Sequence, residues 1–236
     1  SQIQSITTTQ INALTTGQIA SLTTDQAKAL TSKQSLALTT QQLQTLNTDQ
    51  LAAFDPVDLS VLTSDQIAAL KTEQVAALTT GQIIALTSSQ ALSPFFESSA
   101  ASIFSTSQLT SLKTGQVAAL TNTQLPELTT AQIAALKTNQ ITALTNSQIP
   151  QLTTAQIVAL TTGQIAVLKT DQAIALTPVQ IAVIETQDIA AFSTSDIAAL
   201  TSGQITALTT GQIVALTPAE IQAITLDDIA ALTTSQ

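Results

Sequence analysis

The chain lacks the side chains on which most catalytic and metal sites depend. Its 236 residues include no Cys, His, Met, Trp or Tyr. The absence of cysteine excludes disulfide bonds and thiolate ligands. The absence of histidine removes the commonest acid–base group and the commonest metal ligand. No two glycines lie within five residues of each other, which excludes glycine-rich phosphate-binding loops. We therefore expect no enzyme activity, no cofactor and no metal site.

Charged residues are also few, and most of them are acidic. The chain has no arginine, and its six lysines and 15 acidic residues give a net charge of −9. Nucleic-acid binding uses basic groups on phosphates and aromatic platforms for bases, and the composition supplies neither. No apolar run approaches the roughly 20 residues of a membrane-spanning helix. We expect no nucleic-acid partner and no membrane span.

What the chain does contain is one eight-residue repeat with the consensus Q-I-x-A-L-T-T-x. Glutamine recurs in this frame from Gln2 to Gln90 and, after a ten-residue unit, from Gln108 to Gln236. A short and faithful repeat is typical of a solenoid. Hydrophobic residues make up 44% of the chain, which is enough apolar surface for folding. We predict one continuous solenoid over residues 1–236, with an irregular longer unit at about 90–104.

Each octad has the pattern of one short helix that begins with a capping box. In residues 15–22, Thr15 is the expected N-cap and Gln18 stands at N3, the third helical position. The Thr15 hydroxyl would accept from the N3 amide, while the Gln18 side chain would reach back to the N-cap amide. Three prolines fall at N1, where a helix tolerates them. The capping residues predicted from this register are Thr15, Gln18, Asp55, Asp58, Thr177, Gln180, Thr217 and Glu220.

Substitutions within the octad bear on the helical interpretation. Pro126 and Pro150 fall at N5, inside the expected helix, where we predict a 3-10 turn in place of the lost bond. A β-solenoid is the alternative, because Thr and Ile suit strands. The apolar spacing of three favours helix over the alternation of a strand. Acidic residues replace the N3 glutamine where the helix dipole favours them, at Asp58, Asp188, Asp196, Glu220 and Asp228.

Helices of about two turns need neighbours that cover their apolar face. The chain turns at every N-cap, which predicts polygonal coils. Residues 124–147 resemble residues 148–171 at an offset of 24, which favours three helices per coil, a triangular prism. Two helices per coil is the alternative. Position N5 varies without an evident patch and marks the outer face. The predicted core positions N4 and N7 include Ile19, Leu22, Ile67, Leu70, Phe104, Phe192 and Leu200.

Three surface features are candidates for binding. Phe95 and Phe96 in the ten-residue unit form a candidate docking patch, although a packing plug in a widened coil is the simpler interpretation. Asp227 and Asp228 are a candidate contribution to a calcium site, with helix first-turn charge as the simpler interpretation. The second threonine of each octad, at N1, is expected to face outward, and a flat threonine array could order water, as in ice-binding solenoids.

The octad L-T-T-x-Q-I-x-A, which covers the chain from Gln2 to Gln236, resembles Thr- and Gln-rich repeat tracts of very long bacterial surface and secreted proteins of the adhesin-like kind. Residues 176–181 also resemble helix starts in TAL-type DNA-binding repeats, but those repeats are much longer and rich in basic residues, so that function is not carried over.

The resemblance to surface proteins implies a structural extracellular rod or filament segment at the cell surface. The expected partners are neighbouring copies or flanking domains of the same long protein, with end-to-end self-assembly, because no polar capping repeat is visible at either end. An adhesin-type module that binds protein or glycan is the alternative function. Ice binding is a less favoured third.

Overall fold

The fold consists of short helices with one helix per octad. A computed structural model describes residues 2–87, 90 and 103–236, and the described residues contain helices and no strand. The predicted all-helical solenoid is confirmed over these ranges, and the β-solenoid alternative is wrong for them. The contacts divide the chain into two compact units, Ser1–Leu120 and Thr121–Gln236, and each is described by itself.

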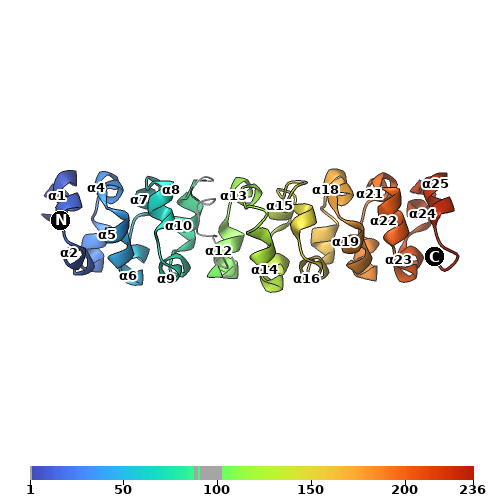
Figure 1. The fold of residues 1–236 in the computed structure, drawn as a ribbon, viewed down its shortest axis with the longest axis horizontal. Coiled ribbons are helices and arrows are strands. Elements are labelled where there is room, and N and C mark those ends of the chain that lie inside the picture. Colours follow the sequence, from blue (N-terminus) through green and yellow to red (C-terminus); the bar gives the residue numbers. More distant parts are fainter. Residues whose placement is uncertain (1, 88–89, 91–102) are drawn as a thin grey trace. The chain divides into compact units, whose positions relative to one another are not determined.

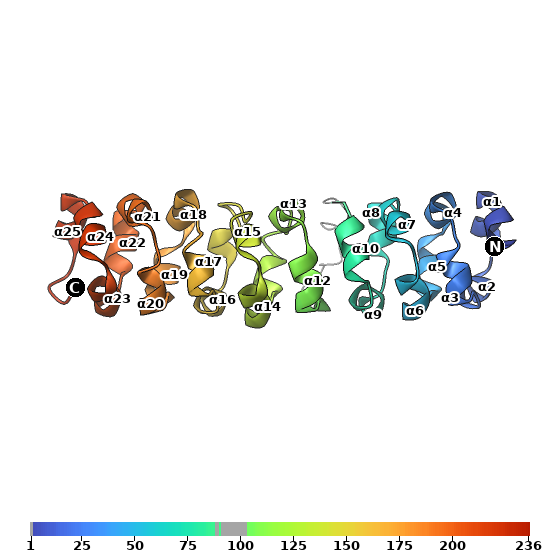
Figure 2. The ribbon, with the colours of Figure 1, turned by 180° about the vertical axis from the view of Figure 1, so that it is seen from behind.

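The helices of both units follow the octad frame (Figures 1 and 2). The first unit contains the 3-10 helix η1 (Gln2–Ser5) and α1 (Thr8–Ala13), α2 (Thr16–Ala20), α3 (Thr24–Lys28), α4 (Ser32–Ala37), α5 (Thr40–Thr45), α6 (Thr48–Ala52), α7 (Pro56–Ser60), α8 (Ser64–Ala68), α9 (Thr72–Ala76), α10 (Thr80–Ala85), α12 (Thr106–Ser111) and α13 (Thr114–Ala118). The second unit contains η3 (Leu125–Glu127), α14 (Thr130–Ala135), α15 (Thr138–Ile141), η4 (Ile149–Gln151), α16 (Thr154–Val158), α17 (Thr162–Ile165), α18 (Thr170–Ala175), α19 (Pro178–Val183), α20 (Thr186–Ile189), α21 (Thr194–Ala199), α22 (Ser202–Ala207), α23 (Thr210–Ala215), α24 (Pro218–Ala223) and α25 (Leu226–Ala231).

The helices are shorter than the two turns that the octad predicts. α2 has five residues and α15 has four. In the octad of α2, the N7 amide of Leu22 donates to the N4 carbonyl of Ile19 at 3.2 Å, a bond of 3-10 type that tightens the helix end. The N-cap Thr15 has extended backbone angles (φ −70°, ψ 158°) and turns the chain. An N-cap at every eighth residue therefore limits each helix.

The two internal prolines have the predicted local effect. Pro126 and Pro150 lie in η3 and η4, where the other octads of the second unit form α-helix. Proline has no amide hydrogen to donate at N5, and a tighter 3-10 turn needs fewer backbone bonds. The prediction of a 3-10 turn at these two octads is confirmed.

Each coil of the described residues contains three helices, because a helix packs on the third helix after it. In the first unit α1 contacts α4, α2 contacts α5, and α3 contacts α6. In the second unit α19 contacts α22, α20 contacts α23, and α21 contacts α24. Three octads make 24 residues, which is the offset that the sequence shows at 124–147. The triangular arrangement is confirmed within each unit, and two helices per coil is wrong.

The ten-residue unit does not disturb the stacking of the described helices on either side of it. α12 packs on α10, and their first residues, Thr80 and Thr106, are 26 positions apart instead of 24. The two additional residues are thus accommodated within one coil. Phe95 and Phe96 lie outside the described residues, as does most of the irregular unit predicted at about 90–104. The single continuous solenoid over residues 1–236 stays a prediction.

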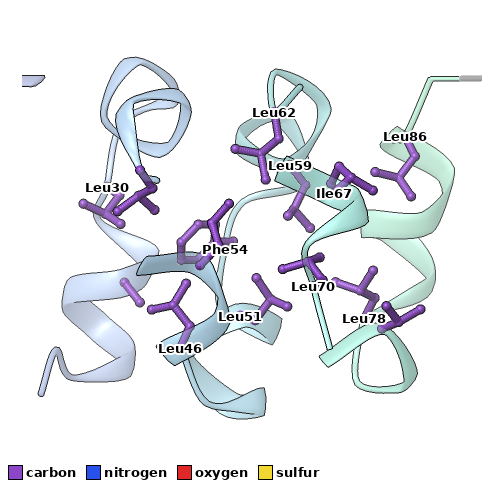
Figure 3. Close-up of a cluster of buried hydrophobic side chains, with 14 of the residues drawn as sticks. Leu30, Leu46, Leu51, Phe54, Leu59, Leu62, Ile67, Leu70, Leu78 and Leu86 are labelled. Atoms are coloured by element: carbon purple, nitrogen blue, oxygen red, sulfur yellow. The ribbon is translucent and has the colours of Figure 1, made fainter. Parts of the chain in front are cut away.

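The N4 and N7 side chains fill the inside of the coils (Figure 3). Leu22 is an exception to the predicted core, because it is only partly buried. It belongs to the first coil of its unit, where a neighbouring coil covers one side only. The other predicted core residues are all buried, namely Ile19, Ile67, Leu70, Phe104, Phe192 and Leu200. The largest exposed fraction among them is 7%, at Leu70 and Phe104.

Candidate functional site

The residue that recurs in every coil is the N3 glutamine, and its first task is local. In α2 the Thr15 hydroxyl accepts from the Gln18 amide at 3.2 Å, and Gln18 Oε1 accepts from the Thr15 amide at 2.9 Å. Thr177 and Gln180 make the same reciprocal pair at 3.2 and 2.7 Å. Each glutamine therefore uses its oxygen to satisfy an amide that a helix start leaves without a partner.

The same side chain also forms hydrogen bonds to the previous coil. Gln164 Nε2 donates to the carbonyl oxygen of Ile133 at 2.9 Å and to that of Leu136 at 2.8 Å, which lie 31 and 28 residues earlier. These carbonyls belong to the end of α14. The Ile133 oxygen also accepts from the Leu136 amide at 3.1 Å, whereas the Leu136 oxygen lies beyond the last bond of the helix, where carbonyls have no helical partner. One glutamine thus caps the start of its own helix and the end of a helix in the previous coil.

This inter-coil bond recurs through both units. A bond to the carbonyl 28 residues earlier is made by Gln34, Gln42, Gln50, Gln66, Gln74, Gln82, Gln90, Gln156, Gln164, Gln172, Gln180, Gln204, Gln212 and Gln236. Beyond the ten-residue unit, Gln116 Nε2 donates to Ile83 and Leu86 at 3.0 Å each, with both sequence offsets enlarged by two. The insertion therefore changes the spacing along the chain and not the bond.

Sequence reasoning assigned the glutamine to capping alone and missed the inter-coil bond. A signal was present, because a capping box accepts Glu as well as Gln, while the chain uses Gln at nearly every N3 position. Only the amide has both an acceptor and two donor hydrogens. The burial of the glutamines follows the same bond. Gln10, Gln18 and Gln26 of the first coil are exposed. Gln34, with an exposed fraction of 3%, and the later N3 glutamines up to Gln212 are buried.

Aspartate at N3 reverses the direction of the inter-coil bond. The Thr170 hydroxyl, 26 residues earlier at N1, donates to Asp196 Oδ1 at 2.7 Å. Thr162 donates to Asp188 at 2.5 Å in the same geometry. An ionised carboxylate accepts only, so the donor has to come from the coil beneath. Thr162 and Thr170 are N1 threonines, which the octad pattern predicts to face outward, and their hydroxyls also bond to the following coil.

Asp55 and Asp58 differ from the predicted capping pair. The Asp55 carboxylate accepts from the Val57 amide at 2.9 Å, and Asp58 accepts from the Ser32 hydroxyl of the previous coil at 2.7 Å. Burial raises the pKa of Asp58 above its usual 3.8, the Ser32 hydrogen bond opposes this rise, and the negative charge of Asp55 adds to it. Two carboxylates at one helix start repel each other, which explains why Asp58 turns toward Ser32 instead.

The other acidic N3 residues keep closer to the prediction. Glu220 Oε2 accepts from the Thr217 amide at 2.6 Å, and the Thr217 hydroxyl accepts from the Glu220 amide at 3.3 Å. Asp228 accepts from the Thr225 hydroxyl at 2.6 Å. Hydrogen bonds from the Ser202 and Thr225 hydroxyls lower the pKa of Asp228, against a smaller effect of burial.

The two side chains of the candidate calcium pair do not converge on one binding site, because Asp227 is exposed while Asp228 is buried. Within the described ranges, no three His, Cys, Asp or Glu side chains come together in a way that could hold a metal ion. Over the same part of the chain, no helix is long and apolar enough to cross a membrane.

One surface hollow of the second unit is lined by Thr142, Asn146, Lys169 and Asp171. The Asn146 side-chain amide donates to Asp171 Oδ2 at 3.1 Å across it, so these two polar groups bind each other. The repeated side chains of both units thus serve chiefly to join one coil to the next.

Five segments of the chain match one repeat family, namely residues 3–40, 51–88, 123–154, 147–178 and 181–218. The chain belongs to the ALTTAQ repeat family. Two of the ALTTAQ matches overlap and begin 24 residues apart, at 123 and 147, which is the length of one coil. Comparison with curated proteins finds no match.

Proposed function

We propose that this ALTTAQ repeat protein is a structural element, a segment of a rod or filament outside a bacterial cell, and that it carries out no catalysis. The observation that carries the proposal is the repeated inter-coil bond from N3 glutamine to the previous coil, as between Gln164 and Leu136. A stack that uses one bond in every coil can be extended to any length by adding octads. Such a design suits a spacer or fibre.

The use of the polar groups supports the same role. Asp188 and Asp196 are buried and accept from hydroxyls of the coil beneath, which is a structural use of carboxylates. The chain has no histidine or cysteine to activate its many hydroxyls. The bacterial surface location rests on the resemblance of the octads to repeat tracts of very long secreted proteins.

Neighbouring copies or flanking domains of the same long protein are the proposed partners. A coil has two different faces, one with glutamine donors and one with carbonyl acceptors. Contacts between unlike faces generate open filaments rather than closed dimers. In the first coil the partly buried Leu14 and Leu22 line a hollow together with the exposed Gln18 and Gln26. A further coil placed there would repeat the contacts found inside the chain.

Electron microscopy of the purified chain at neutral pH tests the proposal. We expect elongated particles of uniform width that lengthen into filaments as the protein concentration rises. Compact round particles at all concentrations would contradict a rod or filament role. Elongated single particles that bind one class of glycan on an array would instead favour the adhesin-type module, and thermal hysteresis would favour ice binding.

A further inference from the structure

Both octads with proline at N5 have asparagine at N1. Asn122 stands four residues before Pro126, and Asn146 stands four residues before Pro150, whereas most other octads have threonine at N1. In an α-helix the N5 amide donates to the N1 carbonyl four residues earlier. Proline has no amide hydrogen, so the carbonyls of these two asparagines cannot receive that bond.

The backbone bonds around Asn146 differ from those of a regular octad. In the preceding octad the N5 amide of Thr142 donates to the N1 carbonyl of Thr138 at 3.0 Å. In the octad of Asn146 the N6 amide of Gln151 donates to Gln148 at 3.0 Å, a bond of 3-10 type that passes over the first two residues of the octad. Asn146 lies in a turn that leads into η4. The peptide bond that follows Asn146 is therefore held less firmly than in an α-helical octad.

Asn146 is followed by Ser147, and both residues are exposed to water. The Ser147 amide lies in the first turn, where amides have no partner inside the helix. Its nitrogen can attack Cγ of Asn146 and form the C–N bond of a five-membered succinimide ring. The Cγ–Nδ2 bond breaks, and ammonia leaves with the proton of the attacking amide. Water then opens the ring and gives aspartate or isoaspartate, the reaction that makes asparagine a labile residue.

We propose that Asn146 is a site of spontaneous deamidation, and that the reaction removes a contact between two coils. The Asn146 side-chain amide donates to Asp171 Oδ2 at 3.1 Å, and the Gln172 amide donates to Asp171 Oδ1 at 3.1 Å. Deamidation replaces the Asn146 donor with a carboxylate, which only accepts. Two carboxylates then face each other, with the one ammonium of Lys169 in the same hollow. Isoaspartate also adds one carbon to the backbone, which shifts the start of the octad.

The other four asparagines of the chain lack this combination of features. Asn12 and Asn139 lie inside α-helices, and Asn47 is an N-cap whose side chain accepts a capping bond. Asn122 also precedes a proline at N5, but the β-branched Thr123 that follows it crowds the attacking nitrogen. Asn146 is therefore the asparagine that should react first.

The inference goes beyond the proposed function and does not depend on it. The reaction needs only the folded chain and water, whether the chain is a rod, a filament segment or a binding module. Its result is a permanent change at one contact between coils of the second unit. The age of the protein would thus determine the fraction of chains in which this contact is intact.

Peptide mapping by mass spectrometry of the full folded chain, incubated at mildly alkaline pH, tests the inference. We expect Asn146 to convert roughly tenfold faster than Asn139, because one helix hydrogen bond fewer opposes ring formation. Pro150→Ala allows that bond and should slow the reaction at Asn146 by a similar factor. Pro126→Ala is the matched control and should leave the rate at Asn146 unchanged. Equal rates at Asn146 and Asn139, or an unchanged rate in Pro150→Ala, would overturn the proposal.

Urea unfolding measures the effect of the reaction on the coil contact. Asn146→Asp mimics the aspartate product, and Asn122→Asp is the control, because the corresponding position opposite Asn122 in the next coil is the uncharged Ser147. We expect a lower urea midpoint for Asn146→Asp than for Asn122→Asp, and no such loss in an Asp171→Asn background. Equal midpoints of the two single variants would overturn the claim that deamidation removes the contact.

Discussion

The side-chain nitrogen of Gln164 lies 2.8 Å from the carbonyl oxygen of Leu136, 28 residues earlier in the chain. The oxygen of the same side chain accepts from the Thr161 amide at 2.8 Å. A residue that caps its own helix thus also holds the previous coil. Local helix formation and coil stacking depend on one side chain in each octad.

Replacement of this glutamine by glutamate separates the two roles. Gln164→Glu keeps the acceptor for the Thr161 amide but removes the donor to the carbonyls of Ile133 and Leu136. Ile133 keeps the Leu136 amide as a donor, so we expect a loss of roughly 1–3 kcal/mol for the buried Leu136 carbonyl, measured by urea unfolding. Gln18→Glu is the matched control, because Gln18 is exposed and makes only the capping bonds. Equal effects of the two substitutions would show that the inter-coil bond contributes little.

Asp58→Gln should stabilise the protein, and the gain should depend on pH. The folded-state pKa of Asp58 is raised, so the folded state holds the proton more tightly than the unfolded state. The stabilising contribution of Asp58 is fully present below its unfolded-state pKa of 3.8 and is lost as the pH rises through its folded-state pKa. We therefore expect a gain of about 1 kcal/mol or more at pH 7 that shrinks in acid.

The measurement is the urea midpoint of Asp58→Gln and wild type between pH 3 and pH 7. Asp49→Asn serves as the control, because Asp49 is an exposed first-turn acid that should gain nothing at neutral pH. A gain that is constant over the whole pH range would contradict the assigned role of the Asp58 charge.

Thr170 and Asp196 should be energetically coupled across two coils. Thr170→Val removes the hydroxyl that donates to the buried carboxylate at 2.7 Å, and we expect a loss of roughly 1–3 kcal/mol. In an Asp196→Gln background the same substitution should be nearly neutral, since the glutamine side chain itself donates to carbonyls of the previous coil. A double-mutant cycle from unfolding free energies gives the coupling. Equal losses in both backgrounds would mean that the reversed bond does not link the coils.

Lys137→Thr should stabilise the second unit. Lys137 occupies an N-cap position without a side-chain capping bond, although Gln140 still accepts from its amide at 2.9 Å. The N3 amide of Gln140 donates to the Lys137 carbonyl at 2.9 Å, and threonine would add a side-chain acceptor for it, worth about 1 kcal/mol. Lys137→Ala is the control, because alanine cannot cap and should give no comparable gain. Thermal unfolding compares the two, and a similar gain in both would point to the lysine charge instead.

The sequence predicts much of this fold because its strongest signals are local. The spacing of Thr15 and Gln18 and the prolines at N1 determine where each helix starts, and Pro126 and Pro150 indicate two 3-10 turns. The bond from Gln164 to Leu136 could not be read in the same way, because its acceptor is a backbone carbonyl and any residue supplies one.

The departures from prediction have physical reasons of the same kind. Leu22 is less buried than an N7 leucine elsewhere because only one coil covers it. Asp58 leaves its capping position because Asp55 repels it and Ser32 offers a donor. Both outcomes depend on what the neighbouring coil or residue supplies, which the octad pattern alone does not specify.

The most direct test of the account is hydrogen exchange of the glutamine side-chain amides, followed by NMR on protein labelled with ¹⁵N in these groups. We predict slow exchange for the buried N3 glutamines that bond to the previous coil, such as Gln34, Gln164 and Gln212. Gln10, Gln18 and Gln26 of the first coil should exchange at the rate of free glutamine. Fast exchange at all of these side chains would contradict the claim that glutamine joins each coil to the one before it.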